Sequence, residues 1–149
     1  MNIQDSLYTK LHTKLQGRRA GVISALLIVL ALIPAALGAA ELRTVDSEEF
    51  FSRYEQARAE GVGTVLDVRT PGEFDRGRAP EALNLDFYDA AFRQSLEALD
   101  REEPYFIYCN SGNRSGRALR MMKDMGFQEV YDLSGGWSRN REALREMGE

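Results

Sequence analysis

Short apolar runs alternate with amphipathic stretches along residues 41–149, and this alternation predicts a succession of strands and helices. Apolar runs bounded by turn residues predict strands at 64–68, 82–85, 105–108 and 130–133. Apolar residues at helical spacing predict helices from Asp46 to about Gly61, over 89–99, over 117–125, and after Gly135-Gly136. Strands that alternate with helices at short spacing favour the α/β class, with a mostly parallel sheet covered by helices on both faces.

The segments that follow the predicted strands are the places to look for chemistry, because parallel sheets bind ligands beyond the carboxyl ends of their strands. After the 64–68 strand, residues 73–80 are expected to form a loop. Asp67, at the end of that strand, is expected to bond neighbouring loops or to pair with an arginine. Neither Asp67 nor Arg69 is expected to be catalytic.

The first forty residues differ from the rest of the chain. Residues 20–40 carry no charge, follow the basic pair Arg18-Arg19, are interrupted by Pro34 and end in Gly38-Ala39-Ala40. This order predicts a signal peptide that is cleaved near its last residue. The alternative is an uncleaved anchor, because such a stretch could just span a bilayer of about 30 Å. In both cases residues 41–149 are expected to lie outside the cytoplasm, free in the periplasm or an equivalent compartment, or anchored to the inner membrane.

Composition narrows the range of functions. The chain has 149 residues with one cysteine, Cys109, and one histidine, His12, so it can form neither a Cys/His metal cage nor an internal disulfide. Its net charge of -4 divides into +3 for residues 1–40 and -7 for residues 41–149, and a body this acidic is not expected to bind nucleic acid. We expect a monomeric domain without cofactor or metal, which contacts a membrane only if residues 1–40 are retained.

Cys109 follows the 105–108 strand directly and opens a segment of small and turn-forming residues, Cys109-Asn110-Ser111-Gly112-Asn113-Arg114-Ser115-Gly116. Such a segment between a strand and a helix can point successive backbone N–H groups inward and form an anion-binding nest, strengthened by the helix dipole. A sulfur at the rim of this nest should have a pKa below the free value of about 8.5, and the thiolate is the reactive form. Arg114 adds a charge and a planar fork for an oxyanion. Ser115 is expected to cap the helix, with a hydroxyl that could also donate a proton.

The mechanism is further limited by what residues 41–149 lack. They contain no histidine, which excludes a Cys–His pair of the protease type and leaves electrostatic activation of the thiol. A thiolate that faces a pocket for a tetrahedral oxyanion could attack the phosphorus of a phosphate ester or the outer sulfur of thiosulfate. A purely structural role stays open from the residues alone, since a lone cysteine after an apolar strand is often part of the core.

Four segments, in order, resemble the rhodanese domain of sulfurtransferases. They are DVRTPGEF at 67–74, APEALNL at 79–85, the loop at 109–115 and LSGGW at 133–137. The resemblance covers most of residues 45–145, and an exported single domain of this kind resembles the periplasmic rhodaneses of the phage-shock type. Two departures concern the rim of the pocket: Gly77-Arg78-Ala79-Pro80 replaces a Gly-His-Ile-Pro stretch, and Trp137 follows the glycine pair directly.

The resemblance implies that Cys109 takes sulfane sulfur from thiosulfate or a related donor as a persulfide and passes it to cyanide or a thiol. It also implies that the backbone amides of Asn110, Ser111, Gly112, Asn113, Arg114 and Ser115 cradle the sulfur, and that Arg114 contacts the anionic donor. Related phosphatases have five residues between cysteine and arginine, whereas four intervene here, which favours sulfur over phosphate. Two alternatives remain: a persulfide carrier that binds a protein partner without efficient turnover, and a phosphatase-like hydrolase.

Overall fold

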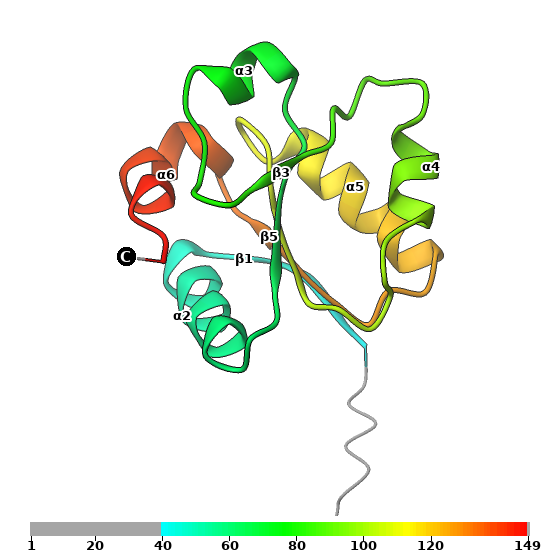
Figure 1. The fold of residues 1–149 in the computed structure, drawn as a ribbon, viewed down its shortest axis with the longest axis horizontal. Helices are drawn as coiled ribbons and strands as arrows, with labels where there is room; N and C mark the ends of the chain where they lie inside the picture. The colour runs from blue at the N-terminus through cyan, green and yellow to red at the C-terminus, as the bar shows by residue number, and fades with distance from the viewer. Residues whose placement is uncertain (1–39, 149) are drawn as a thin grey trace, which may run out of the picture. The chain divides into compact units, whose positions relative to one another are not determined.

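The structure, a computed structural model, describes residues 40–148, which form five strands and five helices (Figure 1). The strands are β1 (Glu41–Val45), β2 (Thr64–Asp67), β3 (Leu83–Asn84), β4 (Tyr105–Tyr108) and β5 (Glu129–Leu133). The helices are α2 (Ser47–Ala59), α3 (Pro71–Asp75), α4 (Phe92–Glu97), α5 (Asn113–Asp124) and α6 (Gly136–Arg145).

The sheet has the order β1-β5-β4-β2-β3, and every neighbouring pair is parallel. The predicted α/β class with a parallel sheet is therefore confirmed. β4 occupies the middle of the sheet, and all four of its residues are buried. Because the strands are parallel, the segments that follow β2, β4 and β5 meet at one edge of the sheet.

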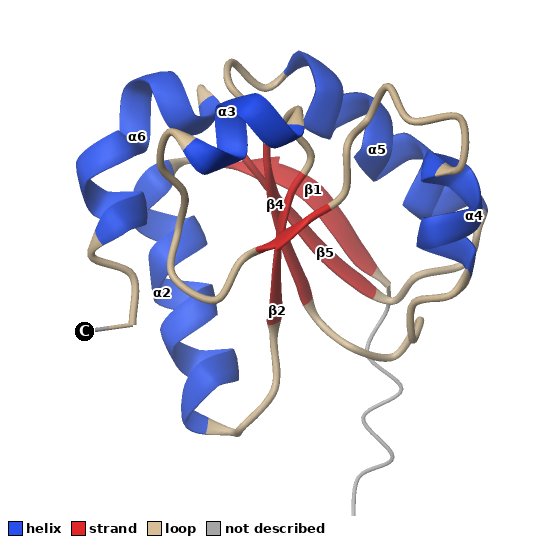
Figure 2. Ribbon diagram, turned by 45° about the horizontal axis from the view of Figure 1, so that its top comes forward, coloured by secondary structure: helices blue, strands red, loops and turns tan. Residues whose placement is uncertain are grey.

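Helices cover both faces of the sheet, with α2 and α6 on one face and α4 and α5 on the other (Figure 2). The first face buries Phe50 and Tyr54 of α2 and Leu144 of α6 against Phe106 and Tyr131. The second face packs residues of α4 and α5 against the alternate side chains of the same strands; among them are Phe92, Leu96, Ala118, Met122 and Ile107. Helix α3 belongs to neither layer and lies beyond the carboxyl end of β2 (Figure 2).

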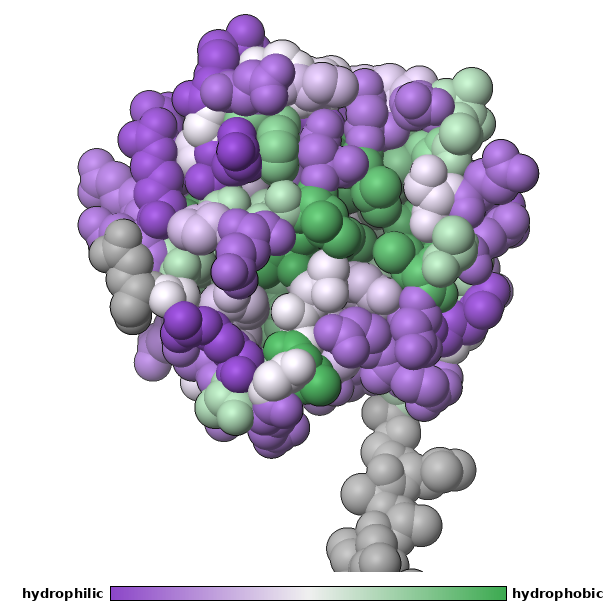
Figure 3. Space-filling view, viewed as in Figure 1, coloured by the Kyte–Doolittle hydropathy of each residue, from purple (hydrophilic) through white to green (hydrophobic). Residues whose placement is uncertain are grey.

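The face in Figure 3 is polar around its edge, and apolar side chains show at its centre. Among residues 40–148, the large hydrophobic residues that are exposed are Val62, Leu83 and Tyr88. No helix in this part of the chain is both long and apolar enough to cross a membrane. The export segment predicted for residues 1–40 lies, apart from Ala40, outside the described residues.

Two elements were not predicted. β1 pairs with β5 along its whole length, from Glu41 beside Glu129 to Val45 beside Leu133. Helix α3 occupies part of the expected loop. It is held by a capping box, in which the Thr70 hydroxyl accepts from the Glu73 N–H and the Glu73 carboxylate accepts from the Thr70 N–H.

Helix α5 begins at Asn113, four residues before the expected start. Gly112 is its N-cap, with a φ of 98° in the left-handed region, and its carbonyl accepts the Gly116 N–H at 2.9 Å. Arg114 and Ser115 therefore lie in the first turn of a helix rather than in a loop. Ser115 does not cap α5, because its hydroxyl donates 3.3 Å to the carbonyl of Gly112 and lies 3.5 Å from the sulfur of Cys109. Helix α4 is shorter at both ends than expected.

Candidate active site

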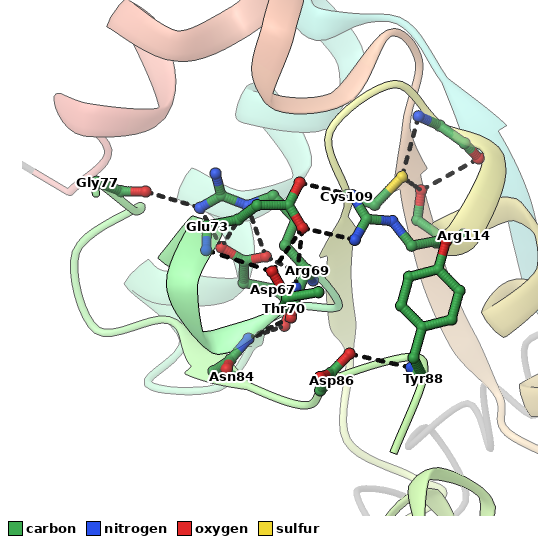
Figure 4. Close-up of polar contacts among 12 residues, drawn as sticks. Asp67, Arg69, Thr70, Glu73, Gly77, Asn84, Asp86, Tyr88, Cys109 and Arg114 are labelled. Carbon is green, nitrogen blue, oxygen red and sulfur yellow. Dashed lines mark hydrogen bonds and ion pairs between the residues drawn. The ribbon is translucent and has the colours of Figure 1, made fainter. Parts of the chain in front are cut away.

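Cys109 lies at the carboxyl end of β4, where the chain turns into α5 (Figure 4). It is 1% exposed and packs with the core on the α4 and α5 side of the sheet. Its Sγ accepts a hydrogen bond of 3.1 Å from the Gly112 N–H and lies 3.5 Å from the Ser115 hydroxyl oxygen. The sulfur is thus buried but is surrounded on its loop side by donors.

These donors change the acidity of the thiol. Burial acts to raise the pKa of Cys109, but the hydroxyl of Ser115 and the backbone N–H groups of Ser115, Ser111 and Gly112 bond the thiolate and outweigh it. The net result is a pKa below the ordinary value for cysteine. Of the six predicted amides, that of Gly112 is hydrogen-bonded to the sulfur, and Asn110 uses its carbonyl to accept the Ser138 N–H of α6 at 2.9 Å.

Arg114 is held by a carboxylate that the sequence did not single out. Its two terminal nitrogens donate to the two oxygens of Glu73 at 2.7 and 2.8 Å, which joins α5 to α3 (Figure 4). Arg114 lowers the pKa of Glu73 to about 2, and Glu73 in turn raises the pKa of Arg114. The arginine that the resemblance assigns to an anionic donor already carries an anionic partner in this structure.

A second ion pair lies beneath α3. Asp67 is fully buried and accepts from the Arg69 Nε through both oxygens at 2.9 Å, and Arg69 is only 2% exposed. Arg69 also donates to the Gly77 carbonyl at 2.7 Å, and its guanidinium stacks 4.4 Å from the ring centre of Trp137. The predicted pairing of Asp67 with an arginine is confirmed, and the pair fixes the segment that carries α3.

The glycine pair before α6 brings that helix against the cysteine. Gly136 has a φ of 52°, and a Cβ at this position would collide with the carbonyl oxygen of Cys109. The Trp137 N–H donates to the same carbonyl at 2.8 Å. Glycine is required here because two backbone segments approach each other closely.

A hollow of about 410 Å³ lies between α3, the Cys109 loop and α6. Arg76, Arg141 and Arg145 line it together with Asn110, the residue after the cysteine. Its remaining lining comes from Arg69, Glu73 and Trp137. A larger hollow of about 570 Å³, between α2 and α6, is lined by none of residues 109–115. The smaller one is therefore the candidate binding site, and of its lining residues only Asn110 was predicted as a site residue; Cys109 and Arg114 are not part of the lining.

The site offers sulfur, backbone donors and arginines, but no metal cage. Within residues 40–148, no group of three or more His, Cys, Asp or Glu side chains is placed to hold a metal ion. The chemistry that this arrangement can perform is nucleophilic attack by an activated thiolate on an anionic compound.

The fold and the site together define an α/β domain with a buried cysteine of lowered pKa between a central strand and a helix. The chain matches the Rhodanese-like domain family over residues 50–143 and belongs to that family.

Relatives and solved structures agree with this assignment. The chain is 36% identical over 99 residues to a protein named "Sulfurtransferase" of Allochromatium vinosum, a match that covers 64% of this chain and 88% of that one. It is 31% identical over 98 residues to the uncharacterized protein YqhL of Bacillus subtilis, covering 66% and 71% of the two chains. The crystal structure of a rhodanese-related protein from Thermoplasma volcanium is 25% identical, with a TM-score of 0.57 over 69% of this chain and 94% of that one.

Proposed function

We propose that the chain is a sulfurtransferase that moves sulfane sulfur from thiosulfate or a related donor to cyanide or a thiol through a persulfide on Cys109. The observation that carries this proposal is the sulfur of Cys109, which is bonded by Gly112 and lies beside Ser115 in a site without histidine. The family and the name of the Allochromatium relative support the reaction class.

The proposed reaction has two displacements. The Cys109 thiolate attacks the outer sulfur of thiosulfate, the bond between the two donor sulfurs breaks, and its electron pair leaves with sulfite. Cyanide then attacks the outer sulfur of the persulfide and leaves as thiocyanate, which returns the Cys109 thiolate. No proton has to be moved in either step, which suits a site that lacks a general base.

The hydrogen-bond donors around Cys109 act on both forms of the sulfur, the thiolate and the persulfide. The N–H of Gly112 and the hydroxyl of Ser115 stabilise the thiolate before the attack and the persulfide anion after it. Arg114, in the first turn of α5, binds the sulfonate end of the donor and the sulfite that leaves in this proposal. To do so it must share its guanidinium with Glu73 or release it.

Mass spectrometry tests the first displacement directly. Incubation with thiosulfate should add about 32 Da to the protein, the mass of one sulfur atom, and Cys109→Ser should remove this addition. Cys109 is the single cysteine of the chain, so the label has one possible position. Absence of the added mass on the intact protein would refute the proposal.

Turnover separates an enzyme from a carrier. Repeated formation of thiocyanate from thiosulfate and cyanide, with ping-pong kinetics, identifies the enzyme. One equivalent of bound sulfur without turnover identifies a persulfide carrier, and steady release of phosphate from an aryl phosphate identifies a hydrolase.

We also propose that the domain acts outside the cytoplasm. The predicted cleavage near Ala40 would leave β1 intact, because this strand begins at Glu41 and the Glu41 N–H donates to Gln128 at 2.7 Å. N-terminal sequencing of exported protein should start near Glu41. A start at Met1 in the membrane fraction would show an anchor instead.

A further inference from the structure

A buried carboxyl that the proposed reaction does not use lies on β5. Asp132 is 1% exposed. Its Oδ2 accepts a hydrogen bond of 2.9 Å from the Thr44 hydroxyl, but its Oδ1 has no hydrogen-bond partner within residues 40–148. In the same part of the chain, no lysine or arginine lies within ion-pair distance of this carboxyl. A carboxyl buried with so little compensation is unfavourable for stability, and such positions are commonly functional.

The carboxyl of Asp132 lies against the first turn of α5. Side chains alternate along a strand, so Asp132 shares the face of Val130, which packs with the core on the α4 and α5 side, and not the face of Tyr131. A Cβ added to Gly116 would lie 3.6 Å from Asp132 Oδ2, so the carboxyl packs directly on the backbone of this turn. The preceding residue of α5 is Ser115, which is fully buried and hydrogen-bonds the same carboxyl.

The hydroxyl of Ser115 acts on two acidic groups. It lies 3.5 Å from the sulfur of Cys109, and after burial, which raises the pKa of this thiol, it is the largest influence and lowers the pKa. Burial likewise raises the pKa of Asp132, and the hydroxyls of Ser115 and Thr44 act against this by hydrogen bonding. The carbonyl of Gly112, 3.3 Å away, is a third acceptor, but it is neutral and therefore weaker than an anion. Because a hydroxyl has one hydrogen, Ser115 can donate to only one of the two anions at a time.

The charge of Asp132 decides where the hydrogen of Ser115 goes. An ionised carboxylate can only accept, so it draws this hydrogen away from the sulfur. A protonated carboxyl carries a hydrogen of its own and can donate it to the Ser115 oxygen, which leaves the Ser115 hydrogen for the thiolate. The thiolate of Cys109 is therefore favoured while Asp132 is neutral and disfavoured once Asp132 ionises.

We propose that Asp132 is a positioning residue, which competes with Cys109 for the hydrogen of Ser115 and so sets the fraction of the sulfur that is thiolate. The inference deepens the proposed function and rests on it for the effect on sulfur transfer. Within residues 40–148, the neighbours that face Asp132 from the other elements carry no full charge. They are the Thr44 hydroxyl of β1, Ile107 of β4, and Ser115 and Gly116 of α5, whereas α2 lies on the opposite face of the sheet. The carboxyl and the thiol therefore titrate as a pair without a third charge to bias them.

Ultraviolet absorbance of the thiolate tests this coupling without any substrate. Cys109 is the single cysteine, so the difference between each protein and its Cys109→Ser form reports the ionisation of this thiol alone. Asp132→Asn cannot ionise, and its amide can donate to the Ser115 oxygen. This variant should therefore increase the acid dissociation constant of the thiol about three- to thirtyfold. Equal dissociation constants in the wild type and Asp132→Asn would overturn the proposal.

A double-mutant cycle shows whether the effect passes through the hydroxyl. Ser115→Ala should decrease the acid dissociation constant of the thiol, and Asp132→Asn should keep less than half of its effect in this background. A larger remaining effect would show that Asp132 acts on the sulfur directly and would contradict the route through Ser115. Asp124→Asn is the matched control, because it removes an exposed charge from the far end of α5 and should leave the thiol unchanged.

The pH dependence of turnover is a property that a purely structural role of Asp132 would not change. In Asp132→Asn, the acid limb of kcat/KM for thiosulfate should move to lower pH by the same factor as the dissociation constant of the thiol. A limb that stays in place would show that Asp132 does not position the reacting sulfur. Failure of the proposed function is recognised separately, because thiosulfate would then add no mass to Cys109, whereas the absorbance titration would be unaffected.

Discussion

Replacement of Glu73 by glutamine separates two interactions of Arg114: its ion pair with Glu73 and its proposed contact with the donor. In the free protein, the Arg114 guanidinium is engaged by both oxygens of Glu73, at 2.7 and 2.8 Å. Glutamine has nearly the same shape, and its side-chain oxygen can still accept from Thr70 at the start of α3. The substitution therefore removes the charge of the partner while it leaves the helix cap in place.

The structure sets the size of the loss of stability expected for Glu73→Gln. A carboxyl whose pKa falls from 4.5 to about 2 on folding gains up to about 3 kcal/mol. The side chains of Arg114 and Glu73 are 14% and 24% exposed, so solvent screening reduces this to about 1–2 kcal/mol. Since the folded pKa is the lower one, the stabilisation is complete above about pH 4.5 and is lost as the pH falls toward 2. Urea unfolding should show Glu73→Gln less stable by this amount at pH 7 and nearly equal to the wild type near pH 2.

The free energy of the ion pair between Glu73 and Arg114 also opposes the binding of thiosulfate to Arg114. If thiosulfate has to displace Glu73 from Arg114, removal of the carboxylate charge should lower the KM for thiosulfate about five- to thirtyfold. The control is Glu97→Gln, which breaks the exposed pair of Glu97 with Arg93 on α4 and should leave the KM unchanged. A KM that rises in Glu73→Gln would show that Glu73 orients Arg114 for the donor, and the competition argument would be wrong.

Three further substitutions test separate parts of the site. Arg114→Ala should lower turnover with thiosulfate about ten- to a thousandfold, and unchanged kinetics would refute its role with the donor. Asp132→Asn should raise stability at pH 7 by about 1 kcal/mol, because burial raises the pKa of Asp132 and its Oδ1 has no hydrogen-bond partner among residues 40–148. Because the folded pKa is raised, the cost builds up as the pH rises from the unfolded value of 3.8 toward the folded one, so the gain should vanish near pH 3 in urea unfolding; a gain that persists there contradicts this. Gly136→Ala should cost about 3 kcal/mol or more and expose Cys109 to alkylation, since its Cβ would meet the Cys109 carbonyl. An alanine variant as stable as the wild type would show that α6 can shift away from the loop.

The strands and long helices were predictable because their signals are local. β4 consists of four consecutive apolar residues, and the core positions of α2 recur at helical spacing. β1 gives no such signal, since only Val45 of its five residues is buried and the strand is fixed by its register with β5. The start of α5 was predicted too late because Gly112 adopts a left-handed conformation that begins the helix inside an apparent loop.

The candidate site also has a part with a local signal and a part that depends on distant residues. Cys109 and its amide donors lie within seven consecutive residues, so their chemistry was visible in the sequence. The pair of Glu73 and Arg114 joins positions 41 residues apart. The sequence feature that could have indicated Glu73 is the capping box at Thr70. That Glu73 meets Arg114 follows only from the parallel pairing of β2 with β4. Sheet order, which the sequence pattern does not supply, is what turns these two local motifs into one site.

The arrangement of charges explains how a site without histidine positions its arginine. The buried pair of Asp67 and Arg69 fixes the end of β2 and the segment around α3. Helix α3 then presents Glu73, and Glu73 holds Arg114 at the start of α5, beside the sulfur that ends β4 (Figure 4). The Glu73–Arg114 contact joins α3 to α5, so the charge beside the Cys109 loop depends on segments that follow both β2 and β4. A Cys109 loop transferred alone to another strand–helix junction would keep its amide donors but would lack the carboxylate that pairs with Arg114.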